Sequence, residues 1–340
     1  KTHFLCGALK ASGISVGLPW TEPGSSEIGH LTLGAGQVVY QHYPKITTAI
    51  KDGSFFENKN IKSAFENARA KKSAVHLVGL LTDGNAHSSL GHLLALIDLA
   101  KKENCEKLYL HLVTDGIDSS PKSALNLLKK IEAKINEIKV GRIASVMGRY
   151  YAMNLDGSWD RTEKAYNAII GTSPVAENIE AAVNKFYEKN LADEYIEPTT
   201  IGAPATVSQS DSLIFFNFRE DGIRQLAAPF IVKEFDAFTV QPNADFYTVT
   251  MTDYYENLQT RSAFPNEKVQ NPLGAVLSTA GKTQLRIAES EKTAHVTSFF
   301  NCFEQQPFPN EYRIIIPSIK TPHPENNPAM MAGAITDRVL

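Results

Sequence analysis

The chain has 340 residues, 43% hydrophobic and 21% charged, which is ordinary for a globular protein and long enough for two domains. Its net charge of −3 shows no basic excess, so we expect no nucleic-acid partner. The longest apolar runs, such as residues 75–81, are far shorter than the roughly 20 residues that span a bilayer. We therefore also expect no membrane partner.

The number and spacing of the cysteines indicate the cellular compartment of the protein. Cys6, Cys105 and Cys302 are widely separated and odd in number, so their spacing fits neither a disulfide framework nor a zinc motif. This predicts a reduced, cytoplasmic protein. The first residue is Lys rather than Met and nothing after it resembles a signal peptide, so we expect the chain to begin inside a longer gene product.

A serine between two glycines lies near the start of the chain, in the heptapeptide GSSEIGH at residues 24–30. Glu27 opens a segment that predicts a helix. A helix N-terminus offers unpaired N–H groups and a positive dipole end, so Ser25 or Ser26 either caps the helix or helps to hold a phosphate group. The hydrolase motif G-x-S-x-G is excluded by its spacing, because Ile28 stands where the second glycine is needed.

The centre of the chain alternates between strand and helix patterns. Continuous apolar runs predict buried parallel strands, and apolar residues repeated every three or four positions predict helices. Ser120 and Pro121 fit the N-cap and the first position of a helix. The predicted strands are 74–81, 107–113, 142–147 and 212–218, and the predicted helices are 90–100, 121–138, 162–170 and 179–187. This βαβ series predicts a mostly parallel sheet covered by helices.

Polar side chains follow four of these strands at their carboxyl ends, where open parallel sheets bind ligands. They are His87, Asp118, Arg149 and Arg219. A histidine, a carboxylate and two guanidinium groups at one edge suit a small anion that undergoes proton transfer. The alternative is that these are ordinary loop residues, with Asp83 and Asp115 serving as turn residues.

The flanking segments have a different character. Short strands are predicted at 246–251, 285–288, 295–300 and 313–316. A charged loop before the third of these contains Lys292, which is either a solvated charge or an ammonium group that stabilises a transferring phosphoryl group. We expect one domain made of both flanks, with the central βαβ domain inserted between them.

Several motifs, in one order along the chain, resemble those of the cofactor-independent (2,3-bisphosphoglycerate-independent) phosphoglycerate mutases. The family's serine motif G-N-S-E-V-G-H appears as GSSEIGH at 24–30, and GRYYAM at 148–153 is equally specific. The further stretches are LGAG at 33–36, VYQ at 39–41, DGSFF at 52–56, FFNFR at 215–219 and EKTAHV at 291–296.

The resemblance implies an α/β fold in which an incomplete alkaline-phosphatase-like domain is interrupted by an inserted α/β transferase domain with a mostly parallel sheet. The expected parts are 1–45 and 267–340 for the phosphatase-like domain, whose C-terminal third is missing, and 46–266 for the substrate-binding transferase domain. The implied activity is the interconversion of 3-phosphoglycerate and 2-phosphoglycerate through a phosphoserine intermediate, in glycolysis and gluconeogenesis. We expect a monomer.

The resemblance also implies roles for individual residues. By matching position, Ser26 would be the nucleophile and a metal ligand. His87 and Asp118 would bind the substrate and move its hydroxyl protons, Arg149 and Arg219 would hold its carboxylate or phosphate, and Lys292 would face the phosphoryl group. The family uses two divalent metal ions, commonly Mn²⁺, but the motifs with the other metal ligands have no counterpart in this sequence.

Three family arginines are replaced here, by Ile117, Leu155 and Gly222. Each lost contact to an anion costs about 2 kcal/mol, so together they cost on the order of a thousandfold in affinity. The sequence therefore leaves another interpretation open. The chain would then be a degenerate, non-catalytic homologue that binds a small phosphorylated or carboxylated ligand, or a phosphotransferase or phosphatase with a different substrate.

Overall fold

The computed structural model describes residues 9–20, 22–155, 157–240, 246–255, 258, 260–266, 269–319 and 327–340, so Cys6 lies outside the described residues. Backbone contacts divide the chain into a flanking unit, residues 1–44 with 267–340, and a central unit, residues 45–266. The expected boundaries were 45/46 and 266/267. Assigning a phosphatase-like and a transferase role to these units remains a prediction.

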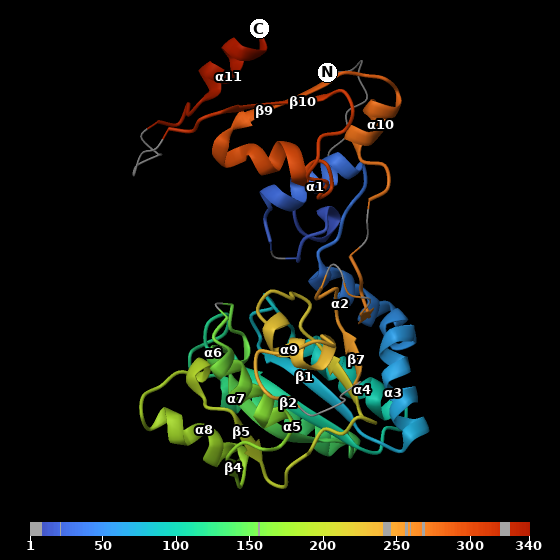
Figure 1. The fold of residues 1–340 in the computed structure, drawn as a ribbon, viewed down its shortest axis with the longest axis vertical. Coiled ribbons are helices and arrows are strands. Elements are labelled where there is room, and N and C mark those ends of the chain that lie inside the picture. Colours follow the sequence, from blue (N-terminus) through green and yellow to red (C-terminus); the bar gives the residue numbers. More distant parts are fainter. Residues whose placement is uncertain are drawn as a thin grey trace, which may run out of the picture. The chain divides into compact units, whose positions relative to one another are not determined.

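The central unit is built on an eight-stranded sheet in the order β4-β5-β3-β2-β1-β6-β7-β8, with β1 and β2 in its middle (Figure 1). Every neighbouring pair is parallel except β3 with β5. The strands are β1 (Val75–Leu81), β2 (Leu108–Thr114), β3 (Arg142–Gly148), β4 (Val175–Ala176), β5 (Thr199–Ile201), β6 (Ser212–Phe215), β7 (Tyr247–Thr250) and β8 (Arg261–Ser262). The predicted α/β class with a mostly parallel sheet is confirmed.

Helix α2 (His42–Asp52), the 3₁₀ turn η2 (Ser54–Glu57) and helix α3 (Lys59–Lys71) lead into β1. The helices that follow connect the strands, and they are α4 (Leu90–Lys102), α5 (Ala124–Ile138), α6 (Arg149–Ala152), α7 (Trp159–Ile169), α8 (Ile179–Tyr187) and α9 (Arg224–Ile231), with a short 3₁₀ turn η3 (Asp193–Tyr195). Helices α4 and α5 connect β1 to β2 and β2 to β3, which runs toward one end of the sheet. Helix α9 connects β6 to β7, which runs toward the other end. Because parallel crossovers are right-handed, α4 and α5 cover one face and α9 covers the opposite face.

Aromatic packing fills the core beside α7 and α9. The Tyr166 and Phe230 rings lie 5.2 Å apart, and Phe215 lies 5.8 Å from Phe230. All seven residues of β1 are buried, which agrees with its continuous apolar run. The strands are therefore held on both faces, and their carboxyl ends form a fixed edge.

Helix α5 begins later than the sequence predicts. Ser120 and Pro121 lie in a turn, and Ser123 is the N-cap before Ala124. The reason is the buried Asp193, whose Oδ2 accepts from the N–H groups of Ser123 at 2.8 Å and Ala124 at 2.9 Å. A distant carboxylate thus supplies the cap that the local sequence pattern assigned to Ser120.

The flanking unit contains a parallel pair of strands, β9 (Gln284–Glu289) and β10 (Glu311–Ile316). Its other elements are η1 (Gly13–Val16), α1 (Ser26–Ala35), α10 (Leu273–Thr279), η4 (Ser290–Lys292), η5 (His295–Phe299) and α11 (Ala332–Val339). None of the helices in the described ranges has the length and apolar character needed to cross a bilayer.

Two strand predictions are wrong in length or type. Residues 295–299 form a π-helix, η5, rather than a strand, because this segment packs against α1. A Cβ on Gly34 of α1 would lie 1.8 Å from the Phe300 carbonyl oxygen, so this close approach needs a glycine. Strand β6 ends at Phe215 rather than at residue 218, and the chain turns at Asn217, whose Oδ1 accepts from the Leu80 N–H at 2.8 Å.

The buried His92 of α4 gives the central unit a pH-dependent stability. Its Nε2 lies 2.9 Å from the Thr47 hydroxyl, and burial lowers its pKa to about 3. The unfolded chain takes up this proton near pH 6.5, so the stabilisation is complete above that pH and is lost as the pH falls below it. As the pH falls from 7.5 to 5, His92 should lower the free energy of unfolding by about 2 kcal/mol.

We expect His92→Leu to flatten the pH dependence of the free energy of unfolding by that amount. Urea titrations followed by Trp159 emission, in a Trp20→Phe background, measure it in the central unit. Thr47→Val keeps the imidazole and should keep the wild-type pH dependence. An unchanged slope in His92→Leu would contradict the assignment.

Candidate functional site

The carboxyl edge of the central sheet carries the four polar residues predicted there. His87 follows β1, Asp118 follows β2, Arg149 begins α6 directly after β3, and Arg219 follows β6. The β1 and β2 loops touch closely. A Cβ on Gly84 would lie 2.2 Å from the Asp118 carbonyl oxygen, so glycine is required for this contact.

Arg149 is held between two carboxylates. Its Nη1 donates to Asp115 Oδ1 at 2.6 Å and to Asp118 Oδ2 at 2.7 Å. The Asp115 side chain is fully buried, whereas that of Asp118 is 23% exposed. Asp115 also accepts from the Thr82 hydroxyl at 2.5 Å. The Arg149 guanidinium, which is 13% exposed, is therefore neutralised by carboxylates of the protein.

These contacts keep the pair charged at neutral pH. Burial alone would raise the pKa of Asp115, but hydrogen bonds from Thr82 and Arg149 outweigh it and leave that pKa below its usual value. Burial would likewise lower the pKa of Arg149, but the bonds to Asp118 and Asp115 raise it above its usual value.

His87 lies between Asp118 and one further carboxylate, that of Asp221. Its Nε2 is 3.9 Å from Asp118 Oδ2, and its Nδ1 is 3.4 Å from Asp221 Oδ1. Its carbonyl oxygen accepts from the N–H groups of Phe218 at 2.9 Å and Arg219 at 3.2 Å, which ties the β1 loop to the β6 loop. Burial, and then the nearby Arg149, lower the pKa of His87 below 6.5, so its ring is neutral at pH 7.

Arg219 completes the arrangement. Its Nη2 lies 2.7 Å from Asp221 Oδ2, and its side chain is 56% exposed. A continuous series of contacts between arginine, carboxylate and histidine side chains thus runs across the edge of the sheet. We call this series the charge chain, and its members in order are Arg219, Asp221, His87, Asp118, Arg149 and Asp115.

The structure brings the four predicted residues of the central unit together through two residues that the sequence analysis did not select, Asp115 and Asp221. In one of the two interpretations of the sequence, Asp115 is only a turn residue, like Asp83. The tripeptide TDG follows both β1 and β2, at 82–84 and 114–116, but Asp83 is exposed and Asp115 is buried. No signal in the tripeptide itself separates the two aspartates. The functional roles of the four predicted residues remain predictions.

In the flanking unit, the two serines of the heptapeptide have different environments. Ser25 is the N-cap of α1, and its hydroxyl accepts from the Ile28 N–H at 3.3 Å. Ser26 is the first helical residue and is exposed. Within the described part of the chain its hydroxyl has no hydrogen-bond partner, so capping does not account for Ser26.

Lys292 contacts the end of β9 and the segment before α11. Its Nζ lies 2.5 Å from Glu289 Oε1 and 3.0 Å from Met330 Sδ. The hydrogen bond to Glu289 is the main cause of a raised pKa, so the ammonium stays protonated. Its predicted place beside a phosphoryl group is not tested by these contacts.

The three positions that replace family arginines fall into two kinds. Ile117 is 60% exposed and Leu155 is 67% exposed. Gly222 lies inside the site, where an added Cβ would come 2.6 Å from Met153 Cε and 3.8 Å from His87 Cε1. The apolar side chains of Ile117 and Leu155 therefore face solvent, at positions where an arginine would fit as well.

A metal centre does not fit the described residues. Across the ranges given above, no group of three or more His, Cys, Asp or Glu side chains could hold a metal ion. The predicted pair of divalent ions, with Ser26 as one ligand, therefore has no matching set of donors in this part of the chain.

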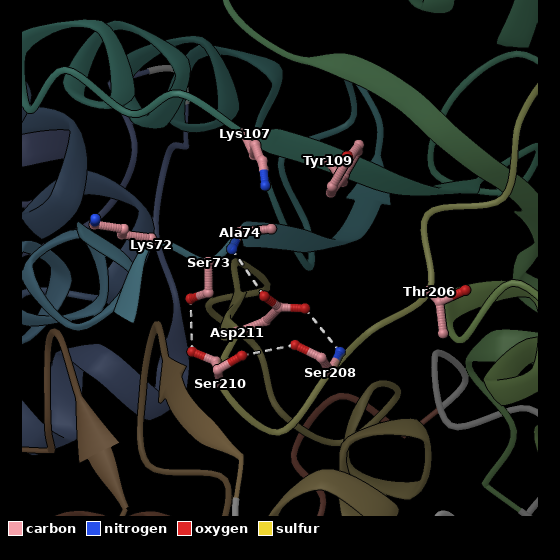
Figure 2. A pocket seen from close by; sticks show the side chains of 9 residues that line it. All are labelled: Lys72, Ser73, Ala74, Lys107, Tyr109, Thr206, Ser208, Ser210 and Asp211. Atoms are coloured by element: carbon pink, nitrogen blue, oxygen red, sulfur yellow. Dashed lines mark hydrogen bonds between the residues drawn. The ribbon is translucent and has the colours of Figure 1, made fainter. Parts of the chain in front are cut away.

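A polar pocket of about 260 Å³ lies at the opposite, amino-terminal edge of the sheet (Figure 2). Its polar groups bond to one another. Asp211 accepts from the N–H groups of Ala74 at 2.8 Å and Ser208 at 2.7 Å, and Ser73 donates to the Ser210 carbonyl at 2.7 Å (Figure 2). These hydrogen bonds connect the loop before β6 to the start of β1. They give Ser73, Ser208, Ser210 and Asp211 a structural role that needs no bound ligand.

The different burial of the two Arg149 partners predicts different losses of stability. Asp115→Ala leaves a largely buried guanidinium with one partner and the Thr82 O–H without its acceptor, so we expect a loss of about 3 kcal/mol. Asp118→Ala removes a partly exposed partner of the same Nη1 atom and should cost about 1 kcal/mol. Urea unfolding followed by Trp159 emission compares the two variants. Equal losses, or a larger loss for Asp118→Ala, would contradict this account of the site.

The chain was compared with known proteins. Residues 46–256 match the family described as the N-terminus of 2,3-bisphosphoglycerate-independent phosphoglycerate mutase. The mutase of Moorella thermoacetica is 46% identical over 98% of this chain and 66% of its own length. That of Clostridioides difficile is 43% identical over 100% of this chain and 67% of its own length.

A solved structure agrees with these sequence matches. The phosphoglycerate mutase of Leishmania mexicana, determined at low cobalt concentration, has a TM-score of 0.69 and 26% identity, and the match covers 97% of this chain and 63% of that one. The chain thus spans about two thirds of the length of the relatives it matches. With the family match over most of the central unit, these similarities show that the chain belongs to the family of 2,3-bisphosphoglycerate-independent phosphoglycerate mutases.

Proposed function

We propose that the chain takes part in the interconversion of 3-phosphoglycerate and 2-phosphoglycerate, with Ser26 as the group that accepts the phosphoryl. Membership of the family supports this proposal. The observation that carries it is the charge chain, which gathers two guanidinium groups and a neutral histidine at the ligand-binding edge of a parallel sheet. In this proposal the central unit is the substrate-binding transferase domain.

The two arginines are suited to different parts of an anionic substrate. Both protein bonds of Arg149 use Nη1, so the Nη2 and Nε side of its planar fork can bind a carboxylate with two hydrogen bonds. Arg219 is more than half exposed and its only charged partner among the described residues is Asp221, so it can turn toward a second anionic group. A three-carbon acid that also bears a phosphate presents two such groups.

His87 would move the hydroxyl proton. A neutral imidazole can accept a proton from a substrate hydroxyl as that oxygen attacks, and the two neighbouring carboxylates, Asp118 and Asp221, would stabilise the imidazolium that forms. Asp118 is itself held by Arg149, so its position is set before the substrate binds.

The phosphoryl group would be carried by Ser26. Its hydroxyl is exposed at the start of α1, where the N-terminal end of the helix favours negative charge. Ser25 caps the helix and leaves the Ser26 hydroxyl available. The described residues include no group of side chains that could hold a metal ion, so no role is assigned to a metal in this transfer.

A second candidate function rests on the replaced arginines. Ile117 and Leu155 expose apolar side chains and Gly222 has none, so the site offers a phosphorylated acid fewer charged contacts. A non-catalytic protein that binds a small carboxylated or phosphorylated ligand is compatible with this.

The two candidates differ in turnover, which ³¹P NMR of the chain incubated with 3-phosphoglycerate measures. We expect 2-phosphoglycerate to accumulate with wild type and with Ser25→Ala, because loss of the cap costs only about 1 kcal/mol of helix stability. Ser26→Ala should give none. Conversion that survives in Ser26→Ala would contradict the proposed nucleophile, and folded wild-type protein without any conversion would favour the non-catalytic candidate.

Restoring one arginine tests whether position 117 belongs to the anion site. Ile117→Arg adds a cation at a solvent-exposed position without displacing buried atoms, and we expect the affinity for 3-phosphoglycerate to rise on the order of tenfold. Val175→Arg adds the same charge at an equally exposed position on β4 and is the matched control. Calorimetric titration gives both affinities, and equal changes in the two variants would show that position 117 does not face the ligand.

A further inference from the structure

We propose that Asp221 is a positioning residue that keeps the His87 proton on Nδ1, so that the lone pair of Nε2 is presented to the ligand. The inference deepens the proposed function, on which its catalytic meaning rests. The tautomer itself can be measured without any turnover.

The two ring nitrogens of His87 face different carboxylates. Nδ1 is 3.4 Å from Asp221 Oδ1, and Nε2 is 3.9 Å from Asp118 Oδ2. A neutral imidazole carries one N–H, and the other nitrogen is an acceptor. Nδ1 is buried and has no completed hydrogen bond within the described residues, so the nearer carboxylate is the group that can satisfy a proton there.

Asp221 is held in place for this role at both oxygens. Its Oδ1 accepts from the Gly222 N–H at 2.7 Å, and its Oδ2 lies 2.7 Å from Arg219 Nη2. The backbone of the same loop is fixed to His87, whose carbonyl accepts from Phe218 and Arg219. The carboxylate and the imidazole are therefore positioned by one shared loop.

Asp118 is less suited to hold the proton. Its Oδ2 lies 3.9 Å from Nε2, half an ångström farther than Asp221 Oδ1 lies from Nδ1. A proton on Nε2 would also point toward the place where a substrate hydroxyl must donate. Second carboxylates that fix the tautomer of a reacting histidine are a general device in proteins.

The charges around His87 agree with a proton on Nδ1 and a free lone pair on Nε2. Burial is the main cause that lowers its pKa, and Arg149 and Arg219 act in the same direction, whereas Asp221 and Asp118 raise it. An anion bound to the two arginines would offset their effect and leave the two carboxylates dominant. The ring would then become more basic as the ligand arrives, with Nε2 as the atom that takes the proton.

The tautomer is measured by NMR of the full chain labelled with ¹⁵N-histidine, at a pH where His87 is neutral. His87→Gln identifies the signal by its loss. We expect more than nine tenths of wild-type His87 to carry its proton on Nδ1. Asp221→Ala should reduce that share below one half, whereas Asp221→Asn, which keeps an acceptor oxygen, should restore most of it.

The matched control is Glu220→Ala, which removes the neighbouring carboxylate that pairs with Arg224. It should leave the tautomer unchanged. Wild-type His87 protonated on Nε2 would overturn the proposal even if no variant folded, as would an unchanged tautomer in folded Asp221→Ala. These results concern the ring nitrogen alone, so they are distinguishable from failure of Ser26-dependent conversion, which would overturn the proposed function instead.

Discussion

A largely buried guanidinium is the constraint on which the edge of the central sheet depends. The Arg149 side chain is only 13% exposed where β3 ends, and such a charge is tolerated only when opposite charges and hydrogen bonds replace the hydration it has lost. Asp115 and Asp118 supply them from the loop after β2, and Thr82 supports Asp115 from the loop after β1. The ends of three neighbouring strands are thereby tied through one side chain.

The remaining part of the charge chain follows from that arrangement. Asp118, fixed by Arg149, stands on one side of His87, and Asp221, fixed by Arg219, stands on the other. In the charge chain, Arg149 and its two aspartates are held by several contacts, whereas Arg219 is exposed and can exchange Asp221 for a ligand. Such a division is expected of a site that must hold one part of its substrate firmly and release another.

The sequence predicts the βαβ order, and helix α8 has the bounds that its periodicity indicates, because apolar spacing records burial directly. It fails where a distant partner decides the local structure. Asp193 caps α5 at Ala124, and residues 295–299, which pack against α1, form a π-helix. The site shows the same limit. His87, Asp118, Arg149 and Arg219 could be selected at strand ends, but Asp115 resembles the exposed Asp83 until the fold places Thr82 beside it.

The central claim is that the charge chain is the seat of an anionic ligand. A crystal structure of the chain grown with 3-phosphoglycerate tests it most directly. The account predicts the ligand at the carboxyl edge of the sheet, with its carboxylate on the Nη2 and Nε side of Arg149 and a hydroxyl facing His87 Nε2. A ligand bound instead at the polar pocket beside Asp211, or at the edge without contact to Arg149, would contradict it.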